Sequence, residues 1–176
     1  MTEDKGRNNA EENLDDDEED EDTQKDKFLT FRVGKEDYGL EICHVTEIIG
    51  IQKITEVPDM PDYVKGVINL RGKVIPIMDV RKRFKFEERD YDDRTCIVVV
   101  HINDTSLGLV VDTVKEVSDI PEKDIQPPPE IAEGNRQFFI RGLGKVEEEV
   151  KILLDAEKLL SKSDLSKVSS VASTQV

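Results

Sequence analysis

Two cysteines and two histidines are the residues of this chain best suited to soft metal ligation or nucleophilic chemistry: Cys43, His44, Cys96 and His101. Cys43 and His44 are adjacent, and Cys96 and His101 are five residues apart in an apolar segment of strand character. Side chains alternate between faces on an extended segment, so neither pair is expected to converge on an ion. The sequence therefore predicts no metal site and no cofactor, with the cysteines packed as small hydrophobic residues.

Motifs for enzymatic chemistry are not found in the sequence either. There is no G-x-S-x-G nucleophile elbow, and most serines lie near the carboxyl end. The segment Gly142-Leu143-Gly144 lacks the third glycine of a nucleotide-binding loop, and we interpret it as part of a hairpin turn. We predict that the chain is not an enzyme and has no catalytic residues.

Arg71 is the side chain whose position most suggests recognition. It lies at the tip of an expected hairpin, where the turn itself needs only a polar residue and the freedom of Gly72. Gly66, earlier in the same segment, permits another backbone to approach closely. An arginine at a turn is either solvated or paired with a carboxylate, which can be Glu47 of the same fold or one on a partner. The sequence leaves these readings open.

The elements that would position these residues are short strands rich in Val and Ile, separated by Gly, Pro and Asp. The pattern from Tyr38 to Ile48 recurs from Leu107 to Val117 at a constant offset of 69 residues. Further along, Gly144-Lys145-Val146 resembles Gly72-Lys73-Val74 at an offset of 72, and Asp155 resembles Asp79 at an offset of 76. Two repeats of about 65 residues predict a mainly β fold of two pseudo-repeated five-stranded barrels with a few short helices.

The expected boundaries follow composition. Residues 1–27 carry thirteen acidic against four basic side chains and predict a disordered acidic arm. Residues 28–161 form the expected folded domain, with subdomains at roughly 28–86 and 94–161, and residues 162–176 are expected to be a flexible tail.

Charge and hydropathy exclude two classes of partner. The net charge of −15 argues against nucleic acid, because phosphate backbones require a basic surface. No apolar run is long enough to span a bilayer, and the first residues lack a signal-peptide pattern. We therefore expect a cytoplasmic protein with no direct membrane insertion.

In combination, several segments resemble the CheW-type coupling proteins of bacterial chemotaxis. They are Phe28-Leu29-x-Phe31, Tyr38-Gly39-Leu40-Glu41-Ile42, Val45-x-Glu47-Ile48, and Lys65-Gly66-Val67-Ile68-Asn69-Leu70-Arg71-Gly72 with the strand that follows it. The resemblance covers about residues 28–161, nearly the whole expected folded part.

The resemblance implies two SH3-like barrels without catalytic activity, which link the cytoplasmic signalling tips of chemoreceptors to the regulatory domain of the histidine kinase CheA, in arrays at the inner face of the membrane. The positions that match the family's protein-binding surface are Val45, Glu47, Ile48, Lys65, Gly66 and Arg71, with Asn69, Leu70 and Gly72 in the same motif.

Other readings remain open. The same fold can serve another receptor–kinase pathway, such as one controlling twitching or a second messenger. A small-ligand-binding β-barrel module or a kinase fragment is less well supported, because the strands supply mostly Val, Ile and Leu to fill a barrel, and the acidic arm offers no phosphotransfer or ATP-binding sequence.

Overall fold

The computed structural model describes residues 24–128, 139–160, 164 and 166–168. Within them, eleven strands alternate with short helices. The strands are β1 Lys27–Val33, β2 Glu36–Glu41, β3 Val45–Gly50, β4 Val64–Leu70, β5 Lys73–Asp79, β6 Cys96–Ile102, β7 Thr105–Val111, β8 Thr113–Asp119, β9 Ile125–Gln126, β10 Ile140–Val146 and β11 Glu149–Leu154. The helices are α2 Val80–Arg83 and the 3-10 helices Ile42–His44, Glu122–Asp124 and Ala156–Lys158.

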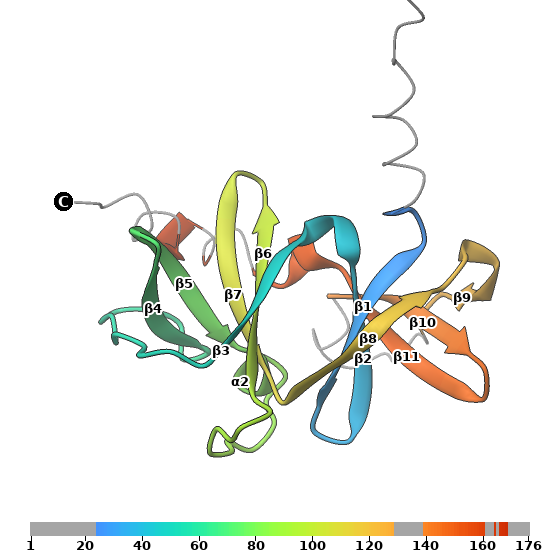
Figure 1. The fold of residues 1–176 in the computed structure, drawn as a ribbon, viewed down its shortest axis with the longest axis horizontal. Helices are drawn as coiled ribbons and strands as arrows, with labels where there is room; N and C mark the ends of the chain where they lie inside the picture. Colours follow the sequence, from blue (N-terminus) through green and yellow to red (C-terminus); the bar gives the residue numbers. More distant parts are fainter. Residues whose placement is uncertain (1–23, 129–138, 161–163, 165, 169–176) are drawn as a thin grey trace, which may run out of the picture.

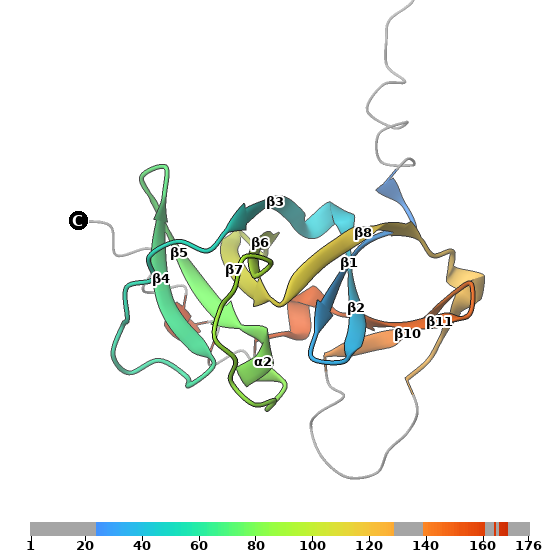
Figure 2. The same ribbon diagram turned by 60° about the horizontal axis from the view of Figure 1, so that its bottom comes forward.

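These strands form two sheets that lie side by side (Figures 1 and 2). Sheet A has six strands in the order β8-β1-β2-β11-β10-β9, and sheet B has five in the order β3-β6-β7-β5-β4. The predicted fold class, mainly β in two units with a few short helices, is confirmed. The count of five strands per unit holds for sheet B, whereas sheet A gains the two-residue strand β9. In sheet B the corresponding position is a single bridge between Thr55 and Val67.

Each sheet takes strands from both halves of the sequence. The hairpin β1–β2 pairs with β8 and β11 in sheet A, while the hairpin β6–β7 pairs with β3 and β5 in sheet B. The two sequence segments 28–86 and 94–161 have therefore exchanged their first hairpins, and neither segment corresponds to one sheet. The chain passes from sheet A to sheet B at Ile42–His44, and returns at Asp112 between β7 and β8.

The 69-residue repeat is visible in the contacts of two glycines. Gly39 pairs with Leu153 across the parallel strands β2 and β11, and Gly108 pairs with Ile77 across β7 and β5. A Cβ atom on Gly39 would lie 2.8 Å from Leu153, and one on Gly108 would lie 2.5 Å from Ile77. In both sheets a glycine thus lets a side chain of the parallel neighbouring strand come close to the backbone. The sequence repeat therefore corresponds to a structural repeat.

The expected match of Gly144 to Gly72 is wrong. Gly142 and Gly144 lie inside β10, whereas the turn that follows β10 consists of Glu147 and Glu148. The offset of 76 residues between Asp79 and Asp155 applies to the whole hairpin that precedes each of them. Arg71 therefore corresponds to Glu147. Their φ angles of 52° and 54° agree with this assignment. The segment Gly142-Leu143-Gly144 is consequently strand, and the turn predicted there does not exist.

The described residues form three apolar clusters, of which the largest joins the two sheets. The largest takes side chains from both sheets, including Phe31, Leu40, Val98 and Leu109. A second lies within sheet B around Ile77, and a third within sheet A consists of Phe28, Ile120 and Leu153. Strands such as β6 are buried on both faces, because alternate residues enter different clusters. This explains their unbroken Val and Ile content.

The two predicted arms lie mostly outside the described residues. The last four residues of the expected acidic arm, 24–27, are described, and the Ile120 backbone N–H donates to the carbonyl of Asp26. At the other end, Tyr63 donates a hydrogen bond to Asp164, and Val168 is fully buried in the shared core. Part of the segment expected to be a flexible tail therefore packs against the domain.

Among the described residues, every helix is too short or too polar to cross a bilayer.

Candidate protein-binding site

The turn between β4 and β5 presents an arginine in a conformation that most side chains avoid. Arg71 and Gly72 have φ angles of 52° and 84°, as in the type I′ turns of two-residue hairpins. Asn69 fixes the turn, because its Oδ1 accepts a hydrogen bond of 2.9 Å from the Gly72 N–H. Asn or Gly at position 71 would adopt this backbone at lower cost. The geometry of the turn therefore does not explain why position 71 is an arginine.

Arg71 pairs with Glu47 across the open end of sheet B. Its Nη2 donates at 2.6 Å to the Glu47 Oε1 and is also within hydrogen-bond distance of Oε2. The pair joins β3, one edge strand of sheet B, to the tip of the hairpin at the other edge. The Arg71 side chain is 72% exposed and that of Glu47 28% exposed. Of the two carboxylate partners left open by the sequence, the structure shows the intramolecular one, with the guanidinium still accessible to solvent.

The apolar candidates divide into exposed and packed residues. Ile48 is 44% exposed on β3, next to Glu47. Val45 instead packs against the core shared by both sheets, and Leu70 packs against the cluster within sheet B. Ile48 is therefore the apolar member of the predicted set that a partner can reach most easily.

Lys65 lies apart from this group, at the opposite end of β4 from Arg71. Its Nζ is 3.5 Å from Glu88 and 4.0 Å from Asp79, and it lies 5.9 Å from the ring centre of Tyr91. The structure brings Glu47, Asn69, Arg71 and Gly72 together, but it does not bring Lys65 to them.

Gly66 is buried, and its role in the structure is internal packing. Its φ is 148°, and a Cβ there would lie 2.0 Å from the carbonyl oxygen of Thr55. The Thr55 and Val67 backbones exchange two hydrogen bonds of 2.8 Å beside it. The close backbone approach predicted for Gly66 is made by the chain's own segment.

A buried charge network in sheet A was missed by sequence reasoning. Asp37 on β2 accepts hydrogen bonds from Lys151 at 2.6 Å, from Lys115 at 3.1 Å and from Arg32 at 3.0 Å. The side chains of Asp37 and Lys151 are only 8% and 4% exposed. Burial alone would raise the pKa of Asp37, but the three cationic donors outweigh it and lower the pKa from 3.8 to about 2.

A second network of hydrogen bonds surrounds Asp112, where the chain passes from sheet B to sheet A. The two oxygens of Asp112 accept from Arg81 at 2.7 and 2.6 Å, and one of them also accepts from the Gly34 N–H at 2.9 Å. Burial raises the pKa of Asp112, yet the hydrogen bonds from Arg81 and Gly34 bring it below its ordinary value. Arg81 follows Asp79, whose carboxylate caps α2 by accepting from the Arg81 N–H. The network ties α2 and the β1–β2 turn to the point where the chain changes sheets.

Comparison with known proteins assigns the fold to a family. The family model described as CheW-like domain matches residues 27–164. This chain belongs to the CheW family. A chemotaxis protein CheW from Klebsiella aerogenes is 39% identical over 146 residues, which cover 83% of this chain and 88% of that protein. The chemotaxis protein CheW of Treponema pallidum is 32% identical over 149 residues, covering 82% and 88%.

The solved structures agree. The crystal structure of the scaffolding protein CheW from Thermoanaerobacter tengcongensis superimposes with a TM-score of 0.73 at 34% identity, covering 79% of this chain and 94% of that one. The relatives carry chemotaxis and scaffolding names, so this CheW-family chain is a member of a group of chemotaxis scaffold proteins.

Proposed function

We propose that this chain is a non-enzymatic adaptor that couples chemoreceptors to the regulatory domain of the histidine kinase CheA. Membership of the CheW family is the observation that carries the proposal. The adaptor acts in the cytoplasm and reaches receptor arrays at the membrane through its partners. Its contribution is a fixed arrangement of surfaces that two different proteins recognise.

The pair of Glu47 and Arg71 is the proposed centre of partner recognition, with Ile48, the next residue of β3, as an apolar contact. An exposed ion pair contributes at most about 1 kcal/mol to folding, so stability alone does not account for an arginine held in a left-handed turn. The exposed guanidinium of Arg71 offers a partner a charged hydrogen bond. The exposed Ile48, which follows Glu47 and so faces the other side of β3, offers an apolar contact. Val45, Lys65, Gly66, Asn69, Leu70 and Gly72 complete the proposed set, Gly66 and Gly72 by shaping the backbone.

Replacing Arg71 with glutamate tests this centre. The substitution places a carboxylate beside Glu47 and leaves the core untouched, so we expect the free energy of unfolding to change by less than about 1 kcal/mol. Assembly with receptor and kinase is expected to weaken at least about tenfold, because loss of a charged hydrogen bond at an interface costs about 2 kcal/mol or more. Co-sedimentation with receptor signalling domains and CheA measures the effect.

Two further variants sharpen the result. Glu147→Arg reverses charge at the equivalent turn of sheet A and is expected to leave assembly unchanged. The double variant Glu47→Arg with Arg71→Glu restores the internal ion pair in reversed order. If the pair only supports the fold, the double variant recovers assembly. If Arg71 contacts a partner, as proposed, assembly stays weak. Normal assembly by folded Arg71→Glu would refute the assignment.

A pull-down with each partner separately tests the coupling function itself. We expect the chain to bind a receptor signalling tip and the CheA regulatory domain. Failure to bind either one, with the chain shown to be folded, would exclude the coupling role and favour a different receptor–kinase pathway.

A further inference from the structure

The crossing from sheet A to sheet B gathers three different metal-ligand types. Glu41 ends β2, and Cys43 and His44 follow in the 3-10 helix Ile42–His44. The expectation of opposite faces assumed an extended segment, and it is wrong here because the backbone turns. Residues three apart eclipse each other on a 3-10 turn, so His44 comes over Glu41. One ligand atom from each of the three residues lies within 4.8 Å of the others.

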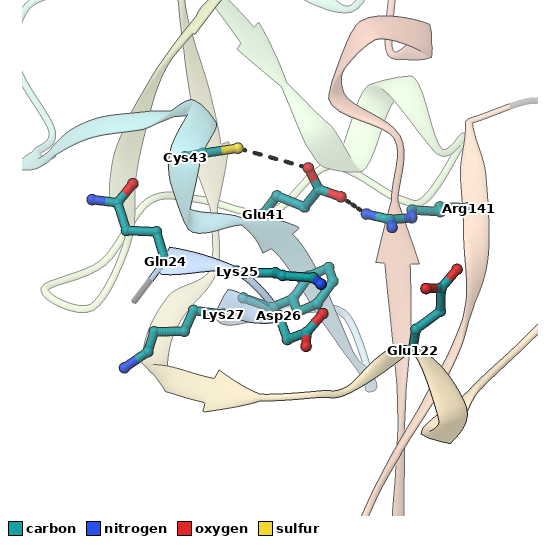
Figure 3. A pocket seen from close by; sticks show the side chains of 9 residues that line it. Gln24, Lys25, Asp26, Lys27, Glu41, Cys43, Glu122 and Arg141 are labelled. Atoms are coloured by element: carbon teal, nitrogen blue, oxygen red, sulfur yellow. Dashed lines mark hydrogen bonds and ion pairs between the residues drawn. The ribbon is translucent and has the colours of Figure 1, made fainter. Parts of the chain in front are cut away.

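Arg141 orients the carboxylate of this cluster. Its guanidinium pairs with the Glu41 Oε1, which turns the Oε2 toward the other two residues. The Cys43 Sγ lies 3.7 Å from that Oε2, and the His44 Nε2 lies 3.6 Å from it. Figure 3 shows Glu41 between the Cys43 thiol on one side and Arg141 on the other.

Two of the three separations in the cluster are close to the edges of a tetrahedral zinc site. The third, between the Cys43 Sγ and a ring nitrogen of His44, is within 4.8 Å. With Zn–S near 2.3 Å and Zn–N and Zn–O near 2.0–2.1 Å, tetrahedral geometry places sulfur and oxygen about 3.6 Å apart, and nitrogen and oxygen about 3.4 Å apart. The two distances in the structure, 3.7 and 3.6 Å, differ from these by about 0.1–0.2 Å. Thiolate and imidazole ligands favour Zn²⁺ over the hard cations Mg²⁺ and Ca²⁺.

The charge around the cluster is compatible with a cation despite Arg141. The two hollows that border Glu41, of about 430 and 220 Å³, are lined by five carboxylates and three cationic side chains, apart from His44. Asp155 and Glu157 line the hollow that His44 also borders. Without Glu41 itself, four carboxylates and three cationic side chains remain, so the surroundings carry a net charge of −1.

We propose that Glu41, Cys43 and His44 form a Zn²⁺ site of three protein ligands, with water in the fourth position. In the bound state Cys43 ligates as a thiolate, with its proton released to solvent, Glu41 as a carboxylate and His44 through an unprotonated ring nitrogen. The site lies where the chain passes between the sheets, so the ion would brace that crossing. This proposal is independent of the adaptor function.

Calorimetric titration of the full-length chain with ZnCl₂ tests the site. The titration is done without an affinity tag and in excess Mg²⁺, a hard cation that competes with Zn²⁺ for the carboxylates of the acidic segment but not for a thiolate site. We expect one Zn²⁺ per chain, a melting temperature that rises with Zn²⁺, and an affinity that falls as the pH is lowered, because the proton competes for the thiolate.

The other cysteine and histidine of the chain supply matched controls. Cys43→Ser and His44→Gln are each expected to raise the Kd at least about tenfold, because even loss of an outer-shell contact typically costs that much. Cys96→Ser and His101→Gln make the same two substitutions at positions outside the cluster. Both variants are expected to bind Zn²⁺ as the original chain does. Wild-type affinity in Cys43→Ser, or no saturable binding in excess Mg²⁺, overturns the proposal. Circular dichroism of each variant checks that it is folded.

Discussion

Asp37→Asn is expected to lower the free energy of unfolding by about 3 kcal/mol. The substitution removes the anion that accepts hydrogen bonds from Lys151, Lys115 and Arg32, and leaves the nearly buried Lys151 with only the exposed Glu149 as its partner. A buried ammonium left with one exposed partner is costly, because that partner replaces only part of its hydration. Urea denaturation followed by circular dichroism measures the loss. Asp93→Asn, at an exposed position, is the matched control and is expected to be neutral.

The effect of Asp37 has a defined pH dependence. The pKa of this carboxyl is lower in the folded state, about 2, than its ordinary value of 3.8, so the unfolded chain binds the proton first as the pH falls. Its stabilisation is complete above about pH 4 and is lost as the pH falls toward 2. The gap between the original chain and Asp37→Asn should therefore narrow between about pH 4 and pH 2. A gap that stays constant over this range would show that charge is not its origin.

Gly66→Ala is expected to destabilise the fold by about 3 kcal/mol or more. The added Cβ would lie 2.0 Å from the Thr55 carbonyl oxygen, a backbone atom that cannot move without breaking the two hydrogen bonds between Thr55 and Val67. Alanine also resists the φ of 148°. Thermal unfolding measures the loss, and proteolysis near residues 51–62 reports whether this segment detaches.

Gly50→Ala provides the control for that substitution. Gly50 is exposed at the end of β3, and a Cβ there meets nothing within 4 Å. We expect it to unfold like the original chain. Equal stability of Gly66→Ala and Gly50→Ala would contradict the packing role, and would return Gly66 to the partner-facing surface as a direct contact.

The strands and their repeat were predictable, but their partners were not. The offset of 69 residues between Gly39 and Gly108 reflects the same requirement for close packing in both sheets. Alternation and turn residues define where a strand lies, yet they carry little information about which distant strand it joins. The parallel pairs β2–β11 and β7–β5 each join, within one sheet, strands that lie far apart in the sequence, so the hairpin exchange was not foreseen.

At the candidate site, too, some residues were predictable from the sequence and others were not. Arg71 was found because the turn itself needs only a polar residue there, and Glu47 was one of the possible partners that the sequence left open. The network of Asp37 and Lys151 was missed because charged residues in strands usually face solvent. One signal was present: Lys151 lies two residues before the buried Leu153, and so on the same face of β11. The Glu41 cluster was missed because a 3-10 turn was read as extended chain.

The exchanged hairpins also constrain the order in which the molecule can be completed during synthesis. All strands of sheet B have been made once the ribosome has passed Val111, so that sheet can close while the chain is still growing. The β1–β2 hairpin is translated first, but β8 and β11, the strands on either side of it, end only at Asp119 and Leu154. The earliest hairpin therefore waits longest with both edges unpaired, the state in which a nascent chain most needs protection from aggregation.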